Sequence, residues 1–130
     1  MKRVLLIDDE QDFCYFVKKN LESNGEFLVN ICDEGVKGLF LIKQMKPDLV
    51  LLDIVMPGIN GTDIAAQMRQ DEELKDIPFA FLTAIIKPDE VEKGHGYIGG
   101  ETIIAKPVAT LDLVRIINEC IVCKKENTHA

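Results

Sequence analysis

The chain lacks several features that mark broad classes of protein. No apolar run approaches the ~20 residues needed to cross a bilayer, and the run Val4–Ile7 is too short for the core of a signal peptide. Basic residues are outnumbered by acidic ones, 15 to 22, and the net charge of -7 argues against direct nucleic-acid contact. Repeats and low-complexity segments are also lacking, and a hydrophobic content of 47% argues against a disordered chain. We expect a cytoplasmic, folded protein without a membrane segment.

Cysteine is scarce, and its placement does not suggest a disulfide framework. The cysteines are scattered through apolar segments and are expected to be reduced, buried thiols: Cys14, Cys32, Cys120 and Cys123. The last two form a C-x-x-C pair, but no second ligand pair accompanies it. A redox or metal role for this pair is therefore the less favoured interpretation.

At 130 residues, the length suits one domain, which we expect to span 1–123 and to be followed by a polar tail at 124–130. Short apolar runs alternate with segments of helical period, which indicates βαβ units around a parallel sheet. The expected strands are Arg3–Ile7, Phe27–Cys32, Asp48–Leu52, Phe79–Leu82 and Thr102–Ala105. The expected helices are Gln11–Asn24, a segment opening at Asp33–Gly35, a segment from Thr62 or Asp63 to Gln70, Asp89–Tyr97, and Thr110–Cys123.

The pattern predicts a doubly wound α/β fold with a five-stranded parallel sheet in the order 2-1-3-4-5. Helices should cover both faces, because the strands are almost continuously apolar. The side chains expected in the core of these helices are Phe13, Phe16, Val17, Leu21, Val36, Leu39, Phe40, Met45, Leu111, Val114, Ile117, Cys120 and Ile121. The fourth helix, at 89–97, should be short because glycines occur within it and beyond its end.

Polar residues stand where the apolar strands end. Asp8 and Asp9 follow the first strand, Asp53 follows the third, Thr83 the fourth and Lys106 the fifth. In a doubly wound sheet these ends meet at one edge, where ligands bind. Three neighbouring carboxylates repel one another, and a hard cation such as Mg²⁺ relieves that repulsion.

The same group suits phosphoryl transfer. The ammonium of Lys106 and the hydroxyl of Thr83 can each serve one oxygen of a phosphoryl group, which is mainly a task of positioning and charge neutralisation. Asp53 would then be the nucleophile and form an aspartyl phosphate.

The chain resembles the receiver domain of response regulators in two-component signalling. The fold that this resemblance implies is the CheY-like, flavodoxin-like fold. The resemblance covers the whole chain and rests on these motifs in order: Asp8-Asp9, Asp53-x-x-Met56-Pro57-Gly58, Thr83-Ala84 and Lys106-Pro107. It implies that Asp53 is the phospho-acceptor, Thr83 the switch hydroxyl and Lys106 the phosphate-sensing lysine. It further implies that Mg²⁺ is bound by Asp8, Asp9, Asp53 and the backbone carbonyl of Val55, and that the Lys106–Pro107 bond is cis.

The resemblance also implies the partners. The phosphoryl donor would be a phosphohistidine of a sensor histidine kinase or of a histidine phosphotransfer protein. The response would be a changed surface over the segments 89–97, 102–105 and 110–123, which controls a downstream protein or an output domain. Such a module is a phospho-accepting regulator rather than an enzyme in the usual sense. The resemblance is also compatible with a homodimer.

Three features depart from the family pattern. Ile103 stands where many receivers have Tyr or Phe, Val108 where Phe is common, and the segment before the fifth strand is rich in glycine. The aromatic half of the family switch is therefore in doubt. Val55 and Ile85 are apolar and cannot orient an attacking water, which predicts slow autodephosphorylation.

Two other functions remain as alternatives. One is a pseudo-receiver, a protein-interaction module that no longer takes up phosphate. The other is a phosphatase of the haloacid-dehalogenase type, which normally carries Asp-x-Asp after its first strand, whereas this chain has adjacent Asp8 and Asp9. A phosphatase assay on small phosphoesters separates them.

Overall fold

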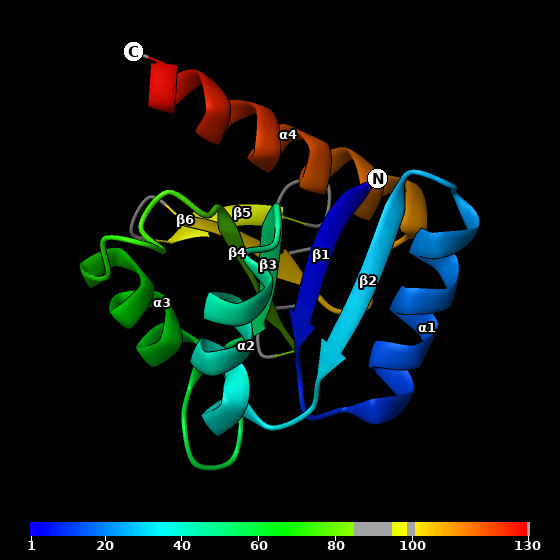
Figure 1. Cartoon of the computed structure of the whole chain (residues 1–130). Helices are drawn as coiled ribbons and strands as arrows, with labels where there is room; N and C mark the ends of the chain where they lie inside the picture. Colours follow the sequence, from blue (N-terminus) through cyan, green and yellow to red (C-terminus); the bar gives the residue numbers. More distant parts are fainter. Residues whose placement is uncertain (85–94, 99–100, 130) are drawn as a thin grey trace.

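The computed structural model describes residues 1–84, 95–98 and 101–129, and it has a central sheet with helices on both faces (Figure 1). The strands are β1 (Lys2–Ile7), β2 (Phe27–Cys32), β3 (Leu49–Asp53), β4 (Phe79–Thr83), β5 (His95–Ile98) and β6 (Glu101–Ala105). The helices are α1 (Gln11–Ser23), the short 3-10 helix η1 (Gly35–Lys37), α2 (Gly38–Met45), α3 (Gly61–Gln70) and α4 (Thr110–His129).

The sheet has the order β2-β1-β3-β4-β6-β5. Every pair from β2 to β6 is parallel, so these strands form the expected parallel sheet of order 2-1-3-4-5, with β6 as its fifth member. The polar residues at the ends of β1, β3, β4 and β6 consequently lie at the same edge. The predicted fold class is confirmed.

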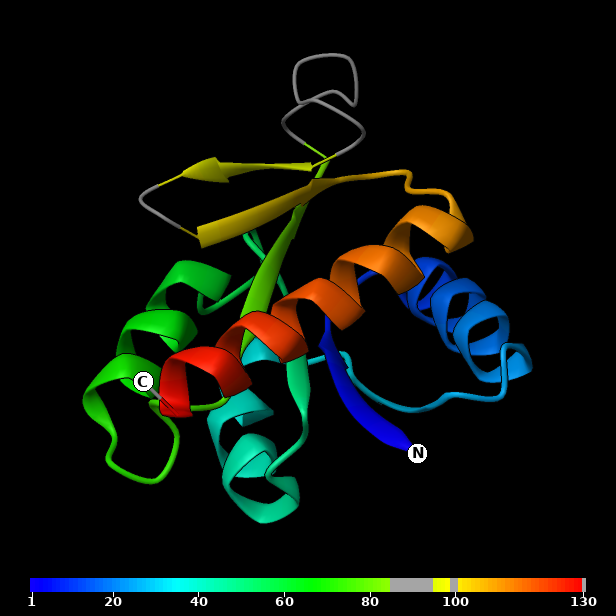
Figure 2. The ribbon, with the colours of Figure 1, turned by 90° about the horizontal axis from the view of Figure 1, so that it is seen from above.

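One strand is additional. β5 pairs antiparallel with β6, with Gly96 opposite Ile103 (Figure 2). The helix expected at 89–97 is therefore wrong at His95–Tyr97, which belong to β5, while 89–94 lie outside the described residues. Each glycine inside a helix costs about 1 kcal/mol relative to alanine, and the pairing with β6 gives this segment backbone hydrogen bonds without a helix.

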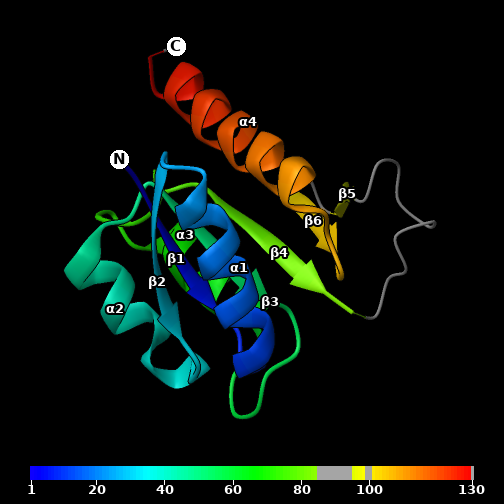
Figure 3. The ribbon, with the colours of Figure 1, turned by 90° about the vertical axis from the view of Figure 1, so that its right-hand side faces the viewer.

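Two hydrophobic layers cover the sheet. On one side, buried residues of α1 and α4 pack on the strands, among them Val17, Leu21, Ile116 and Ile117 (Figure 3). On the other side, α2 and α3 bury Ile42, Ile64, Ala65 and Met68. The residues of β3 are buried throughout, as expected of a central strand covered on both faces.

Some helical residues expected in the core are exposed. In the second helical segment, Val36 and Phe40 are exposed, whereas Gly38 and Ile42 are buried. The reason is that η1 opens the segment with a 3-10 turn, which shifts the phase of the buried stripe relative to a single α-helix.

One predicted core residue in each of α1 and α4 is also exposed. Phe16 is exposed, whereas the predicted Val17 and Leu21 are buried together with Cys14. Leu111 is exposed because the buried positions of α4 begin at Leu113.

The last helix also extends past the predicted end at Cys123, to His129. Within the described residues, no helix is long and apolar enough to cross a membrane.

All of the cysteines are free thiols, as expected. Cys14 and Cys32 are buried, Cys120 is half-buried and Cys123 is exposed, so the expectation of burial is wrong for Cys123. Burial, together with the charge of Asp8, raises the pKa of the Cys14 thiol to about 12. Such a thiol is inert as a nucleophile and acts here as a small core residue.

Candidate functional site

The carboxyl ends of four parallel strands form the site. Asp53 ends β3, Thr83 ends β4, and Asp8 and Lys106 directly follow β1 and β6. The backbone pairing continues past the strand ends: Asp8 N–H donates to the Cys32 carbonyl at 3.0 Å and Lys106 N–H to the Thr83 carbonyl at 2.9 Å. The expected gathering of these residues is thus observed, and the Lys106–Pro107 bond is cis, as the resemblance implied.

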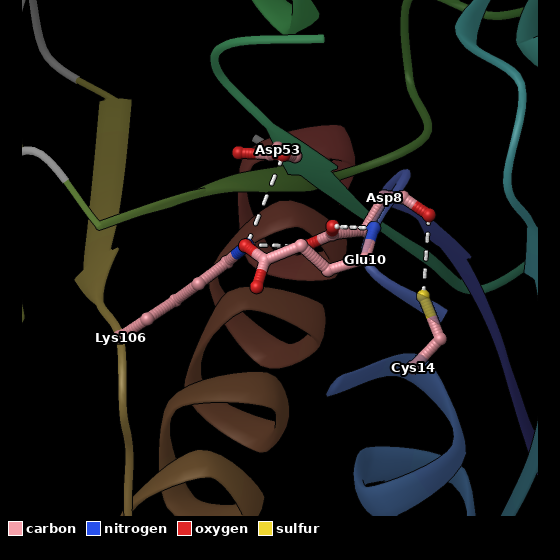
Figure 4. Close-up of polar contacts among 5 residues, drawn as sticks. All are labelled: Asp8, Glu10, Cys14, Asp53 and Lys106. Carbon is pink, nitrogen blue, oxygen red and sulfur yellow. Dashed lines mark hydrogen bonds and ion pairs between the residues drawn. The ribbon is translucent and has the colours of Figure 1, made fainter. Parts of the chain in front are cut away.

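Lys106 lies at the centre of the charges (Figure 4). Its Nζ is 2.6 Å from Asp8 Oδ2, 2.9 Å from Glu10 Oε1 and 3.8 Å from Asp53 Oδ2. The Lys106 side chain is only 7% exposed. The ammonium is therefore largely removed from water and compensated by three carboxylates.

Asp8 is fully buried, and its position is set by the start of α1. Its Oδ1 accepts the backbone N–H of Glu10 at 2.9 Å, and its backbone carbonyl accepts the Cys14 thiol at 3.3 Å. The other oxygen, Oδ2, lies 2.6 Å from the Lys106 ammonium and has no further hydrogen-bond partner among the described residues. A cation bound among these carboxylates would share this oxygen with Lys106.

The acidic groups titrate abnormally. Burial raises the pKa of Asp53 to about 7, and the charge of Asp8 and the nearby carboxyl of Asp9 add to the effect, while Lys106 opposes it. Burial also raises the pKa of Asp8, although Lys106 and the Glu10 N–H oppose the shift. Burial alone would lower the pKa of Lys106, but its contacts with Asp8 and Glu10 raise it above the usual range, so the lysine stays charged.

The donor set fits a hard divalent cation. Carboxylate oxygens of Asp8, Glu10 and Asp53 lie within 4.8 Å of one another, and oxygen ligands are those that Mg²⁺ prefers. A cation there would also relieve the repulsion that raises the Asp53 pKa. The residues therefore fit the metal that the resemblance implied.

Of the predicted metal ligands, only Asp8 and Asp53 belong to this group of carboxylates. Glu10 takes the third place in it and was missed, although it continues the acidic run Asp8-Asp9 at the start of α1. Asp9 is exposed and stands outside the group, beside Asp53. Direct ligation by Asp9 and by the Val55 carbonyl remains a prediction; the Val55 side chain is 55% exposed.

The loop after Asp53 returns the chain close to its own strand. Gly61 N–H donates to the Ile54 carbonyl at 2.9 Å, and a Cβ at Gly61 would overlap the Asp53 carbonyl oxygen and lie 3.0 Å from the carbonyl carbon. Asp63 accepts the Asn60 N–H at 3.2 Å and so helps to begin α3. The phospho-acceptor candidate is thus held from both ends, by β3 and by the start of α3.

The remaining predicted positions are Thr83 and Ile85. Thr83 is buried at the end of β4, one residue past Leu82, which pairs with Asp53 of the neighbouring strand. Ile85, which was predicted to flank the path of water, lies outside the described residues.

Comparison with known proteins agrees with this arrangement. A family model described as the response regulator receiver domain matches residues 4–118. Protein PilH of Pseudomonas aeruginosa is 36% identical over 119 residues, which cover 91% of this chain and 96% of that protein. The DNA-binding dual master transcriptional regulator RpaA of Synechocystis is 35% identical over 107 residues, which cover 82% of this chain. The match covers only 44% of RpaA.

Solved structures show the same fold. The CheY-like receiver domain protein from Methanospirillum hungatei has a TM-score of 0.78 at 23% identity, over 98% of both chains. The chemotaxis protein CheY4 of Vibrio cholerae has a TM-score of 0.76 at 22% identity, over 92% of this chain and 98% of that chain.

Proposed function

Because the chain belongs to the response regulator receiver domain family, we propose that it is a phosphorylation-switched signalling module in which Asp53 accepts a phosphoryl group. The observation that carries this proposal is the contact set of Lys106. Its ammonium lies 2.6 Å from Asp8 and 3.8 Å from Asp53, in a site with little exposure to water. An ammonium in that place can neutralise charge on a phosphoryl group bound to Asp53.

The proposed reaction begins with the Asp53 carboxylate. One of its oxygens attacks the phosphorus of a phosphohistidine; the new O–P bond forms as the P–N bond breaks, and its electron pair returns to the imidazole nitrogen, which takes up a proton. Bound Mg²⁺ would supply charge neutralisation to the phosphoryl oxygens. Lys106 would hold a second oxygen and Thr83 would donate its hydroxyl to a third. Asp53 must be ionised to attack, and a cation beside it favours that form.

The switch would act through the end of β4. If Thr83 moves toward the phosphoryl group, the backbone after β4 follows it, and the surface over β6 and α4 changes its preference for partners. Ile103 is 2% exposed in the core and pairs with Phe81, so no aromatic side chain changes place at that position. The signal would therefore pass through the backbone shift alone.

The proposed partners are those that membership of the receiver domain family implies. A sensor histidine kinase or a histidine phosphotransfer protein would supply the phosphoryl group, and a downstream protein or an output domain would read the changed surface. PilH, of which this chain matches 96%, represents a protein of about the length of one receiver domain. RpaA, of which this chain matches 44%, represents the other case, a receiver within a DNA-binding protein.

The experiment is the intact mass of the protein after incubation with acetyl phosphate, with and without Mg²⁺. We expect one added phosphoryl group that requires Mg²⁺ and is absent from Asp53→Asn. Asp12→Asn, in which an exposed carboxyl of α1 is changed, is the matched control and should react like the wild type. No added mass in the wild type, with the phosphoryl mimic beryllofluoride also failing to bind, would indicate a pseudo-receiver. Turnover of small phosphoesters that persists in Asp53→Asn would indicate a phosphatase.

The lifetime of the aspartyl phosphate gives a further prediction. Val55 follows the acceptor by two positions, and its exposed apolar side chain cannot orient a water for attack. We expect the phosphorylated wild type to lose its phosphoryl group more slowly than Val55→Asn, by roughly severalfold. The decay of the phosphorylated mass after removal of acetyl phosphate measures both rates. Faster decay in the wild type would contradict the prediction.

A further inference from the structure

An aromatic ring completes the surroundings of Lys106. The Lys106 Nζ lies 4.5 Å from the centroid of the Phe13 ring. Phe13 stands in the first turn of α1, is half-buried, and packs on the hydrophobic layer formed by α1 and α4. The ammonium thus has carboxylates and the face of a benzene ring as neighbours.

A ring face attracts a cation because the aromatic quadrupole is negative there, and the attraction grows when water is excluded. Lys106 meets this condition, since its side chain is 7% exposed. The distance of 4.5 Å is within the range of about 6 Å over which such contacts act. The contact therefore meets the distance and desolvation conditions under which a cation–π attraction is appreciable.

The other partners of Lys106 change during the proposed reaction. Asp8 and Glu10 belong to the group of oxygens that suits a divalent cation, and Asp53 would carry the phosphoryl group. All three carboxylates around the lysine thus have competing partners. A ring is not a ligand for a hard cation, which prefers oxygen. Phe13 is the neighbour that no competing partner removes from the lysine.

The start of α1 sets the ring in place relative to the acids. Cys14, the next residue, donates its thiol to the Asp8 carbonyl at 3.3 Å and its backbone N–H to the Glu10 carbonyl at 3.0 Å. The helix that carries the ring is thereby tied to the segment that carries Asp8. The ring and the acidic group form one unit in front of Lys106.

We propose that Phe13 is a positioning residue. Its ring face holds the Lys106 ammonium beside Asp53 while Asp8 binds the cation and Asp53 takes up the phosphoryl group. This inference rests on the proposed function, because it concerns the lysine that would bind the phosphoryl group. The ring touches neither the phosphoryl group nor the metal; it acts through Lys106. A leucine would preserve most of the apolar contact and lose the cation–π attraction.

The test is a titration with beryllofluoride at saturating Mg²⁺, followed by ¹⁹F NMR, on the wild type, Phe13→Leu and Phe13→Tyr. We expect Phe13→Leu to weaken beryllofluoride affinity by roughly three- to thirtyfold. Phe13→Tyr retains the ring and should remain within about twofold of the wild type. The affinity for Mg²⁺ alone should be unchanged in Phe13→Leu, because the ring is not a ligand.

A double-mutant cycle separates positioning from packing. In a Lys106→Met background, Phe13→Leu should have no further effect on beryllofluoride affinity. An equal loss in both backgrounds, or no loss in the wild-type background, would overturn the inference. Phe13→Met serves as the ring-free variant if Phe13→Leu does not fold. Failure of the wild type itself to bind beryllofluoride would overturn the proposed function, and this inference with it.

Discussion

Lys106 and Asp8 form a buried ion pair within the group of oxygens that suits a divalent cation. Asp8 Oδ2 is buried and lies 2.6 Å from the Lys106 ammonium, and among the described residues it has no further hydrogen-bond partner. A cation that binds this oxygen meets a positive charge at close range. The affinity of the site for Mg²⁺ would therefore include the cost of repulsion between the cation and the Lys106 ammonium.

This competition predicts the effect of Lys106→Met. Removing the ammonium should raise the affinity for Mg²⁺ by roughly threefold or more, because two positive charges a few ångströms apart repel strongly in a site with little water. Isothermal titration calorimetry measures the affinity. Lys19→Met removes the same charge from an exposed position on α1 and should change the affinity little. An unchanged or weaker Mg²⁺ affinity in Lys106→Met would contradict the account.

Some residues of the site could be predicted from the sequence and others could not. Asp8, Asp53, Thr83 and Lys106 end apolar runs, and the parallel fold brings such ends together, so their neighbourhood could be predicted. Glu10 could not be placed in the same way, because it lies one residue beyond the paired acids and its direction depends on how α1 begins. The contact of Phe13 with Lys106 joins β6 to α1 and has no local signal in the sequence.

At the scale of elements, the close approach of α3 to β3 determines where Asp53 is held. Only glycine fits at Gly61 without a clash between its side chain and the Asp53 carbonyl group. The helix can therefore begin directly beside Asp53. This is a steric requirement rather than a need for unusual backbone angles.

Gly61→Ala should displace the Asp53 backbone or the start of α3. We expect a loss of about 1–3 kcal/mol in the free energy of unfolding, as for other overpacked sites, together with slower uptake of phosphate from acetyl phosphate. Urea denaturation and the phosphorylation rate measure the two effects. Thr62→Ala, at the next and exposed position of α3, is the control and should alter both much less. Wild-type stability and rate in Gly61→Ala would show that the approach is not tight.

A second element-level contact protects the edge strand β2. Glu22 of α1 accepts the backbone N–H of Val29 at 3.0 Å, and Lys18 donates to the Val29 carbonyl at 2.6 Å. These side chains satisfy backbone groups that an edge strand leaves without a neighbouring strand. The Val29 N–H and then Lys18 lower the pKa of Glu22 below its usual value of 4.5.

The lowered pKa defines a pH dependence. The ionised Glu22 stabilises the folded state above the ordinary value of 4.5, and this contribution is lost as the pH falls through the lower folded-state pKa. Glu22→Gln should therefore cost about 1 kcal/mol of unfolding free energy near neutral pH and little in acid. Urea denaturation at both pH values measures this. Glu73→Gln, at an exposed position, is the control; a cost that is independent of pH would contradict the assignment.

The elements themselves were predictable to different degrees. The parallel strands follow from continuous apolar runs, and their bounds agree with the sequence to within a residue or two. The buried faces of helices were less predictable, because η1 changes the helical phase and exposes Val36 and Phe40. The strand at His95–Ile98 depends on pairing with β6, a tertiary contact that the helical interpretation of this glycine-rich segment did not consider.

At the scale of the whole molecule, the fold places function at one edge and stability elsewhere. Two apolar layers cover the sheet, while the charged residues of the site collect where β1, β3, β4 and β6 end. In the proposed switch, a change of charge on Asp53 would act first at the ends of these strands, which lead into the surface over β6 and α4. That arrangement is what a phosphorylation switch requires.

The central claim is that the phosphoryl group is carried by Asp53. Reduction with borohydride converts the acyl phosphate of an aspartate into homoserine, and tandem mass spectrometry then locates the modified residue. After incubation with acetyl phosphate and Mg²⁺, the account predicts homoserine at position 53 and unmodified aspartate at Asp8 and Asp9. Homoserine at Asp8 or Asp9, or no homoserine in a protein that has gained a phosphoryl group, would contradict it.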